Sequence, residues 1–344
     1  MTIVQRGASG SRAFLAVAAA AAVLAASGAD AQTTLRFNRW LPPNHNVQGG
    51  VMGEWAKQVE TVTQGRVKVA FTASSLGPPP RQVDLAAQGV ADLVLGVHGY
   101  TPARFRMTQM VEMPFLGATG EKISGAYWEV HRSHLTKANE HEGVTLLALW
   151  VHGPGLIANS VRQVTRIEDF DGLKLRVAGG LMTEIATSLG AVPIQAPVPQ
   201  LYEILSRGVA DGVLFTGEGV TGFNLEKVVK HVTNVPGGLF NTSFFLAANP
   251  RKWESLSAAD RTAIEGLSGK ALSMAAGRSY DERDAVADKD LRAAGIRLVT
   301  ADAGFVAALK SRLAPLEVAW IADARTKGID GKSAIERLRA LAAR

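Results

Sequence analysis

Strand and helix patterns alternate along residues 168–216, and this alternation constrains the fold more than any other feature of the chain. Leu173, Leu175 and Val177 alternate with Lys174 and Arg176, the period of two that is typical of a half-buried strand. A helix, a second short strand, another helix and a third strand are expected to follow. Interleaved strands and helices of this kind favour α/β architecture.

Arg176 is the candidate binding residue of this segment. It lies at the C-terminal end of its strand, where open α/β sheets bind ligands. Its guanidinium is planar and always charged, and it offers two parallel N–H donors to one carboxylate. The alternative is an ordinary surface or structural ion pair. We expect the chain to present these two N–H donors to the carboxylate of an organic acid.

The N-terminus is typical of an export signal. Arg6 and Arg12 precede an apolar run over residues 13–26, and Ala29-Asp30-Ala31 forms a small-x-small cleavage site before Gln32. The run has about 14 residues, against the ~20 that span a bilayer. Residues 1–31 are therefore expected to be removed, leaving a soluble periplasmic protein. The absence of cysteine excludes disulfides and thiolate chemistry.

The net charge and the length of the chain limit the classes of protein to which it can belong. The formal net charge is +6, and losing two arginines and one aspartate with residues 1–31 leaves +5. Basic residues are scattered rather than clustered, which argues against a nucleic-acid partner. About 310 mature residues suggest two domains.

The remaining pattern predicts further elements and one crossover. The bend at His152-Gly-Pro-Gly155 is expected to connect two lobes, and a strand over 241–249 to return to the first lobe. Strands are also predicted over residues 34–40, 66–73, 91–96, 143–150 and 296–300. Helices are predicted over residues 51–63, 81–88, 122–140, 224–230, 257–295, 303–325 and 332–343.

Seven more residues are candidates for contact with a solute. They share positions at strand ends or in loops that would face a cleft. The alternatives are core packing or a lobe rim for the aromatic residues, a hinge-capping role for His152, and solvent exposure for Glu218. These residues are Trp40, His45, Tyr100, His152, Phe215, Glu218 and Phe240.

Metal, cofactor and catalytic sites are not expected. His131 and His134 share a face of a polar helix and His141 neighbours Glu142, which indicates a solvated surface rather than a metal centre. The stretch 217–222 fits GxGxxG but lacks the acidic residue about twenty positions later that a dinucleotide site needs. No GxSxG elbow or complete phosphate loop occurs.

The chain resembles the periplasmic solute-binding proteins of tripartite ATP-independent (TRAP) transporters, the DctP type. The resemblance covers nearly all of the mature chain, and it rests on the order and spacing of motifs that are individually weak. The motifs are Gly65-Arg-Val-Lys-Val with Leu76-Gly77, Gly89-Val-Ala-Asp92, Met113-Pro-Phe-Leu116, Asp171-Gly-Leu-Lys-Leu-Arg176, Leu189-Gly-Ala-Val-Pro193, Leu201-Tyr-Glu203, Gly208-Val-Ala-Asp-Gly212, and Asn249 with Trp253.

The resemblance implies a two-lobe α/β fold of the periplasmic-binding-protein kind. Each lobe would be a mixed sheet flanked by helices, and crossing strands and a long helix would join them. Residues 32–153 with about 242–281 would form lobe I, and residues 154–241 with about 282–344 lobe II. It also implies that Arg176 binds the carboxylate of the solute and that the closed form delivers it to TRAP membrane permease subunits.

Departures from the family pattern narrow the expected solute. Relatives that bind polyhydroxylated acids or dicarboxylates commonly carry a polar Gln-Glu-Asn run after the Asp-Gly turn, where this chain has Val213-Leu214-Phe215. A second arginine, often about twenty residues before the main one, is replaced by Leu156 or its neighbours. We therefore expect an apolar or aromatic monocarboxylate, such as a 2-oxo, 2-hydroxy or aryl acid. The alternative is a periplasmic enzyme that acts on a carboxylic acid.

Overall fold

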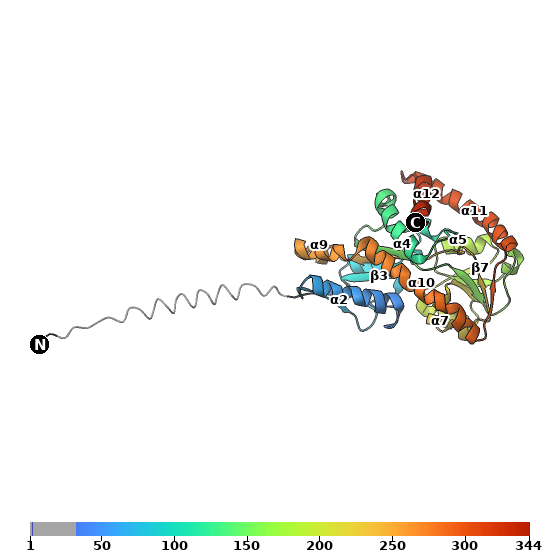
Figure 1. Ribbon diagram of the computed structural model, residues 1–344, viewed down its shortest axis with the longest axis horizontal. Helices are drawn as coiled ribbons and strands as arrows, with labels where there is room; N and C mark the ends of the chain where they lie inside the picture. Colours follow the sequence, from blue (N-terminus) through green and yellow to red (C-terminus); the bar gives the residue numbers. More distant parts are fainter. Residues whose placement is uncertain (1, 3–31) are drawn as a thin grey trace.

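The structure is a computed structural model that describes residue 2 and residues 32–344. The expected export signal, apart from residue 2, lies outside the described residues. Two sheets build two lobes that lie side by side (Figure 1). The first lobe holds a five-stranded sheet in the order β2-β1-β3-β10-β4, and the second a six-stranded sheet in the order β11-β9-β5-β8-β6-β7.

Both sheets are mixed. In the first, β1 runs parallel to β2 and β3, whereas β10 is antiparallel to β3 and β4. In the second, β6 is parallel to β7 and β8, and β5 is antiparallel to β8 and β9. The strands are β1 (Thr33–Phe37), β2 (Val67–Phe71), β3 (Leu93–Val97), β4 (Thr145–Val151), β5 (Leu156–Asn159), β6 (Lys174–Val177), β7 (Val192–Gln195), β8 (Gly212–Phe215), β9 (His231–Asn234), β10 (Ser243–Ala248) and β11 (Arg297–Thr300).

Helices flank both sheets, as the α/β two-lobe fold requires. They are α2 (Met52–Val62), α3 (Gln82–Ala87), α4 (Gly120–Val130), α5 (Leu181–Ser188), α6 (Leu201–Ser206), α7 (Gly217–Gly222), α8 (Pro250–Glu254), α9 (Ala258–Gly266), α10 (Gly269–Ala293), α11 (Ala303–Thr326) and α12 (Gly331–Ala342). The large side chains of Trp55, Trp150 and Trp320 are fully buried. The expected fold class is confirmed.

The long helix α10 joins the lobes, together with the chain crossings from β4 to β5 and from β9 to β10. It packs against α4 and β4 of the first lobe and against α7 and β11 of the second (Figure 1). The expected lobe boundaries stay a prediction. The C-terminal helix α12 packs on α4 of the first lobe and on α11, which in turn packs on α5 of the second lobe.

Several predicted elements are shorter or divided. The helix predicted over 122–140 ends as α4 at Val130 and continues as π and 3₁₀ turns up to Ala138. Within residues 224–230 only Leu225–Lys227 form a helical turn, of the 3₁₀ type, and it follows Asn224 in a left-handed conformation with φ 56°. Strands β5 and β9 were not predicted.

The predicted solvent exposure of the histidines between residues 131 and 141 is wrong for two of the three. His131 and His141 are buried, and they pack with His98, Phe105 and Tyr127. The Nε2 atoms of His98 and His141 lie 2.9 Å apart. Burial lowers the pKa of His131 to about 4. The rings therefore belong to the core of the first lobe.

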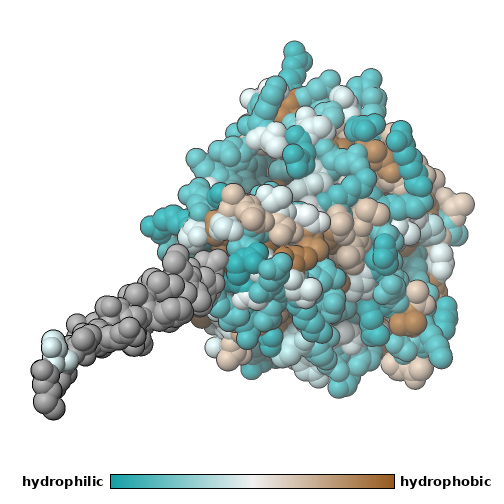
Figure 2. All heavy atoms as spheres, turned by 60° about the vertical axis from the view of Figure 1, so that its left-hand side comes forward, coloured by the Kyte–Doolittle hydropathy of each residue, from teal (hydrophilic) through white to brown (hydrophobic). Residues whose placement is uncertain are grey.

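The surface is mainly polar. Figure 2 shows a face on which hydrophilic side chains predominate and hydrophobic ones lie in small groups. Within residues 32–344, no helix combines the length and the hydrophobicity needed to cross a bilayer.

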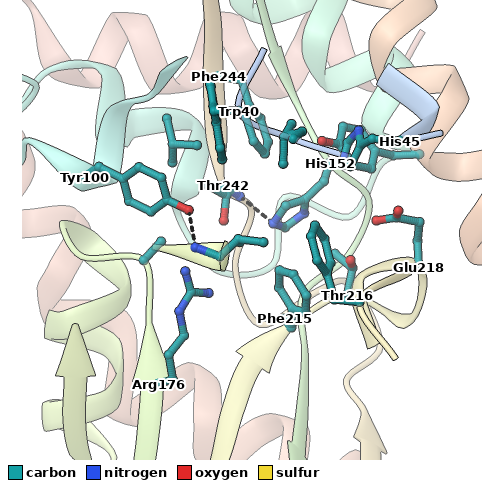
Figure 3. A pocket seen from close by; sticks show the side chains of 16 residues that line it. Trp40, His45, Tyr100, His152, Arg176, Phe215, Thr216, Glu218, Thr242 and Phe244 are labelled. Carbon is teal, nitrogen blue, oxygen red and sulfur yellow. Dashed lines mark hydrogen bonds between the residues drawn. The ribbon is translucent and has the colours of Figure 1, made fainter. Parts of the chain in front are cut away.

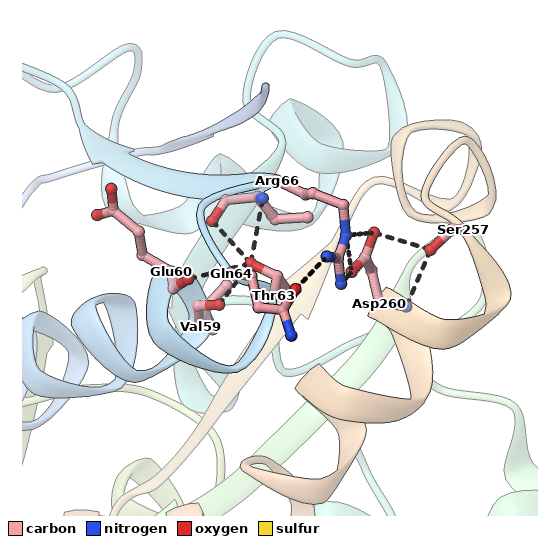
Figure 4. A network of polar contacts seen from close by, with 8 residues as sticks. Val59, Glu60, Thr63, Gln64, Arg66, Ser257 and Asp260 are labelled. Carbon is pink, nitrogen blue, oxygen red and sulfur yellow. Dashed lines mark hydrogen bonds and ion pairs between the residues drawn. The ribbon is translucent and has the colours of Figure 1, made fainter. Parts of the chain in front are cut away.

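A polar network holds α9 against the turn that precedes β2 (Figure 4). Arg66 binds the carboxylate of Asp260 through Nη2 at 2.8 Å and Nε at 3.1 Å. Ser257, the residue before α9, donates its hydroxyl to Asp260 at 2.8 Å and accepts the Asp260 N–H at 3.0 Å. The Arg66 hydrogen bonds and charge lower the pKa of Asp260, so the ionised carboxylate stabilises the fold.

We expect Asp260→Asn to lower the free energy of unfolding by about 1 kcal/mol at neutral pH, because Arg66 stays partly exposed and water screens the pair. A carboxyl with a lowered folded pKa stabilises above its unfolded pKa, about 4, and this contribution is lost as the pH falls through the folded pKa. Denaturant unfolding should therefore show the gap between wild type and variant closing at acidic pH. Glu265→Gln, on the exposed side of α9, is the control; a gap that persists in acid would contradict the prediction.

Candidate functional site

A narrow cavity lies where the two lobes and α10 meet (Figure 3). Its empty volume is about 460 Å³, including the space at its mouth. The first lobe contributes Trp40, Leu41, His45, Val97, Tyr100, Thr242 and Phe244, the second contributes Arg176, Ala178, Val198, Phe215, Thr216, Glu218 and Phe223, and the crossover and α10 contribute His152 and Tyr280.

Arg176 enters this cavity from the C-terminal end of β6. The neighbouring Leu175 and Val177 are buried on the other face of the strand, so the alternation directs the guanidinium to the cavity. Its Nε donates to the carbonyl oxygen of Ala196 at 2.8 Å, whereas Nη2 has no hydrogen-bond partner. Among the residues that the structure describes, no carboxylate lies within ion-pair distance of Arg176.

The unpaired guanidinium is energetically unusual. Its side chain is 1% exposed, and burial lowers the pKa of Arg176 although the nearby Tyr100 opposes the shift. Arginine nonetheless stays protonated in proteins. An isolated buried charge costs several kcal/mol unless an opposite charge neutralises it, so the cavity favours an anion.

Tyr100 connects the two lobes beside this charge. Its hydroxyl accepts the backbone N–H of Val198 at 2.9 Å, and burial raises its pKa, so the phenol stays neutral. The hydroxyl hydrogen is thus available to a bound anion.

Aromatic rings form the walls. The Phe215 ring centroid lies 5.8 Å from Arg176 Cζ, a cation–π contact. Phe244 stacks on Tyr280 at 5.7 Å, and Trp40 meets Tyr100 edge-on at 6.2 Å. Because the Trp40 Nε1–H donates to the carbonyl oxygen of Leu95, the indole offers the cavity only apolar surface. The walls suit a flat apolar body.

His152 has no free ring nitrogen. Its Nε2 accepts the backbone N–H of Thr242 at 3.0 Å, and its Nδ1 lies 2.6 Å from the carbonyl oxygen of Gly153. A peptide N–H only donates and a carbonyl only accepts, so the proton must sit on Nδ1. Burial lowers the pKa of His152 to about 4. The ring therefore fastens the crossover and has no donor left for a solute.

His45 keeps one donor free. Its Nδ1 accepts the N–H groups of Val47 and Gln48 at 3.2 and 3.5 Å, at the start of a π-helical turn over Asn46–Val51. The proton of the neutral ring is therefore on Nε2. Burial lowers the pKa of His45 to about 4, so the ring stays neutral.

Glu218 brings a buried carboxyl group to the cavity from the first turn of α7. Its backbone N–H donates to Asp284 Oδ1 of α10 at 2.7 Å, while its own carboxyl oxygens have no hydrogen bond to any described residue. Burial raises the pKa of Glu218 to about 7, with Asp284 adding to the shift and Arg283 opposing it.

The structure brings seven of the eight predicted site residues together at the cavity. Phe240 is not among the lining residues; its ring packs behind the cavity against His152 at 5.7 Å and against Gly155. Sequence reasoning did not name the other nine lining residues, which are Leu41, Val97, Ala178, Val198, Thr216, Phe223, Thr242, Phe244 and Tyr280. Some of them carried a local signal: Thr242 and Phe244 lie in the predicted returning strand, and Thr216 directly follows Phe215.

The GxGxxG stretch forms α7, and N–H groups of its first turn bond to Asp284 and Thr216 of the protein itself. Thr216 caps this helix by accepting the Gly219 N–H at 3.0 Å. In the part of the chain that the structure describes, no group of three or more His, Asp or Glu side chains is arranged to hold a metal ion.

Comparison with known proteins supports the motif-based resemblance. The family model of DctP, bacterial extracellular solute-binding protein family 7, matches residues 37–320. A TRAP periplasmic solute-binding protein from Bordetella bronchiseptica, solved with bound (R)- and (S)-mandelate, is 37% identical; the match covers 90% of this chain and 99% of that one, with a TM-score of 0.88. A TRAP solute-binding protein from Rhodoferax ferrireducens, in complex with copurified benzoate, is 29% identical over 91% and 98% of the two chains, with a TM-score of 0.85.

A curated relative agrees over nearly the full length. The outer membrane transporter protein TsaT of Comamonas testosteroni is 31% identical over 330 residues, which cover 96% of this chain and 97% of the relative. The family match and these likenesses show that the chain belongs to the DctP family of bacterial extracellular solute-binding proteins, the solute receptors of TRAP transporters.

Proposed function

We propose that this protein captures an aromatic monocarboxylate in the periplasm and delivers it to the membrane subunits of a TRAP transporter. The observation that carries the proposal is the buried Arg176 guanidinium, which has no anionic partner among residues 32–344 and opens onto an aromatic cavity. A bound carboxylate would supply the missing charge and accept from Nη2. The similar proteins solved with mandelate and benzoate, both aromatic monocarboxylates, support this proposal.

The lining argues against more polar solutes. Arg176 is the one lysine or arginine among the lining residues, so a second carboxylate would find no second cation and would face Glu218. The backbone occupies both nitrogens of His152 and the indole nitrogen of Trp40. A polyhydroxylated acid would lose water without regaining its hydrogen bonds, at about 1–3 kcal/mol for each unpaired group.

Capture requires the two lobes to close around the acid. The Tyr100–Val198 hydrogen bond and an ion pair between Arg106 and Glu184 at 2.5 Å join the lobes. A solute that touches both lobes stabilises the closed state by its extra contacts there. The carboxylate would contact Arg176 of the second lobe and the ring would contact Trp40 of the first.

The enzyme alternative has a direct test. Incubation with benzoate and mandelate should leave both acids unchanged while raising the unfolding temperature with 1:1 stoichiometry. Formation of a product would favour catalysis. Mass spectrometry of the small acid that copurifies with the protein would identify the solute class independently.

We expect Arg176→Lys to weaken benzoate and mandelate binding at least tenfold by calorimetry, because an ammonium keeps the charge but loses the two-pronged geometry. Arg176→Met should abolish binding without lowering the unfolding temperature of the ligand-free protein, since it removes an unpaired buried charge. Arg207→Lys, at an exposed position, is the control. Unchanged affinity in Arg176→Lys would remove Arg176 from the site.

Two glycines approach each other closely where the lobes meet. A Cβ on Gly179 would lie 2.2 Å from the carbonyl oxygen of Gly99 across the lobe interface, and 2.5 Å from Nε2 of Gln195, a flexible side chain of its own lobe that can move away. Both Gly179 and Gly172 have positive φ, 111° and 69°, but a Cβ on Gly172 would meet no atom within 4 Å. The two positions therefore separate interface overlap from backbone strain.

Gly179→Ala should hold the lobes apart and reduce benzoate affinity at least tenfold. Gly172→Ala should cost about 1–2 kcal/mol of stability for its left-handed backbone and leave affinity unchanged. Calorimetry and thermal unfolding measure the two effects separately. Equal affinity in the two variants would show that the Gly99–Gly179 contact does not control closure.

A further inference from the structure

The cavity has a second polar end that the carboxylate does not use. Glu218 is 6% exposed and its carboxyl oxygens make no hydrogen bond to a described residue, yet it lines the cavity. Figure 3 shows Glu218 and His45 on the same side of the cavity, away from Arg176. In this view the Phe215 ring lies between Arg176 and Glu218. A buried polar group without a partner is costly, so this end is built for a ligand group.

Glu218 and Arg176 do not satisfy each other. They form no ion pair, and the charges that shift the pKa of Glu218 are those of Asp284 and Arg283 rather than Arg176. The two groups are thus held apart in one cavity, with aromatic rings lining the space. A ligand with a carboxylate at one end and a polar group at the other would meet both.

The hydrogen-bonding roles at this end select one kind of group. His45 offers only a donor, because its Nδ1 already accepts two backbone N–H groups. Glu218 offers an acceptor when ionised. A hydroxyl can accept from His45 Nε2 and donate to Glu218 at once. A second carboxylate would be repelled by Glu218, and an ammonium would meet the N–H of His45.

We propose that Glu218, with His45, forms a hydroxyl-recognition subsite that selects aromatic monocarboxylates carrying a hydroxyl on the part of the ring remote from the carboxylate. This inference rests on the proposed function and refines its solute class. It assigns Glu218 a direct specificity role rather than a purely structural one.

The surroundings of Glu218 agree with this role. Asp284, Arg283 and Tyr280 face it from α10, and His45 faces it from the first lobe. Burial places the pKa of Glu218 at about 7. The ionised carboxylate, which predominates above this pH, accepts the hydrogen bond of the hydroxyl more strongly than the protonated carboxyl does, so preference for the hydroxyl should increase with pH.

The test compares matched ligands by calorimetry: 3- and 4-hydroxybenzoate against 3- and 4-methylbenzoate, with benzoate as reference. The wild-type protein should bind at least one hydroxybenzoate about tenfold more tightly than its methyl counterpart. Glu218→Met should abolish this preference while retaining methylbenzoate binding. Glu218→Gln, whose amide can still bond a hydroxyl, should retain part of the preference but lose its pH dependence between about pH 5.5 and 8, where phenols stay neutral.

Equal affinity of the wild type for the hydroxyl and methyl ligands would overturn the inference, as would a hydroxyl preference that survives Glu218→Met or does not vary with pH in the wild type. Tighter binding of terephthalate or 4-(aminomethyl)benzoate than of the hydroxybenzoates would also overturn it. If benzoate binds through Arg176 but no hydroxyl preference appears, only the subsite fails. If none of these acids binds, the proposed function itself fails.

Discussion

An unpaired guanidinium in a buried cavity is the constraint on which the site depends. A cation held at 1% exposure without an anion destabilises the ligand-free closed protein. The fold tolerates Arg176 because one nitrogen is satisfied by Ala196 and the charge also contacts the Phe215 ring. Under the proposed function, a bound carboxylate would turn this cost into binding free energy. Affinity and closure would then be coupled, because only the closed lobes exclude the water that would otherwise solvate the charge.

Helix α10 organises the approach of the two lobes through carboxylates placed at helix N-termini. Asp281 accepts the N–H groups of Gly120 and Glu121 at 2.7 and 2.8 Å, where α4 begins in the first lobe. One turn further on, Asp284 accepts the Glu218 N–H at 2.7 Å, where α7 begins in the second. Free N–H groups at a helix start favour such acceptors. One helix thus anchors an element of each lobe, and it places Glu218 at the cavity.

Sequence patterns predicted most of this architecture but less of its site. The strand alternation around Arg176 predicted that its side chain leaves the buried face of the strand, and the structure places it in the cavity, because period and position are local properties. The burial of His131 and His141 could not be predicted, since it depends on packing against His98, which lies more than thirty residues away. Tyr280 was not predicted as a cavity residue for a similar reason, because only the path of α10 between the lobes brings its ring to the cavity.

Residue type also could not tell which polar groups remain free for a ligand. His152 and His45 both lie in loops and both reach the cavity, yet the backbone takes both nitrogens of His152 and only one of His45. The difference arises from Thr242 and Gly153, whose positions are set by the crossover between the lobes. Once such bonds are counted, the unsatisfied Arg176 Nη2 and the unbonded Glu218 carboxyl stand out among the lining polar groups. Recognition is then a matter of which buried groups the fold itself leaves without partners.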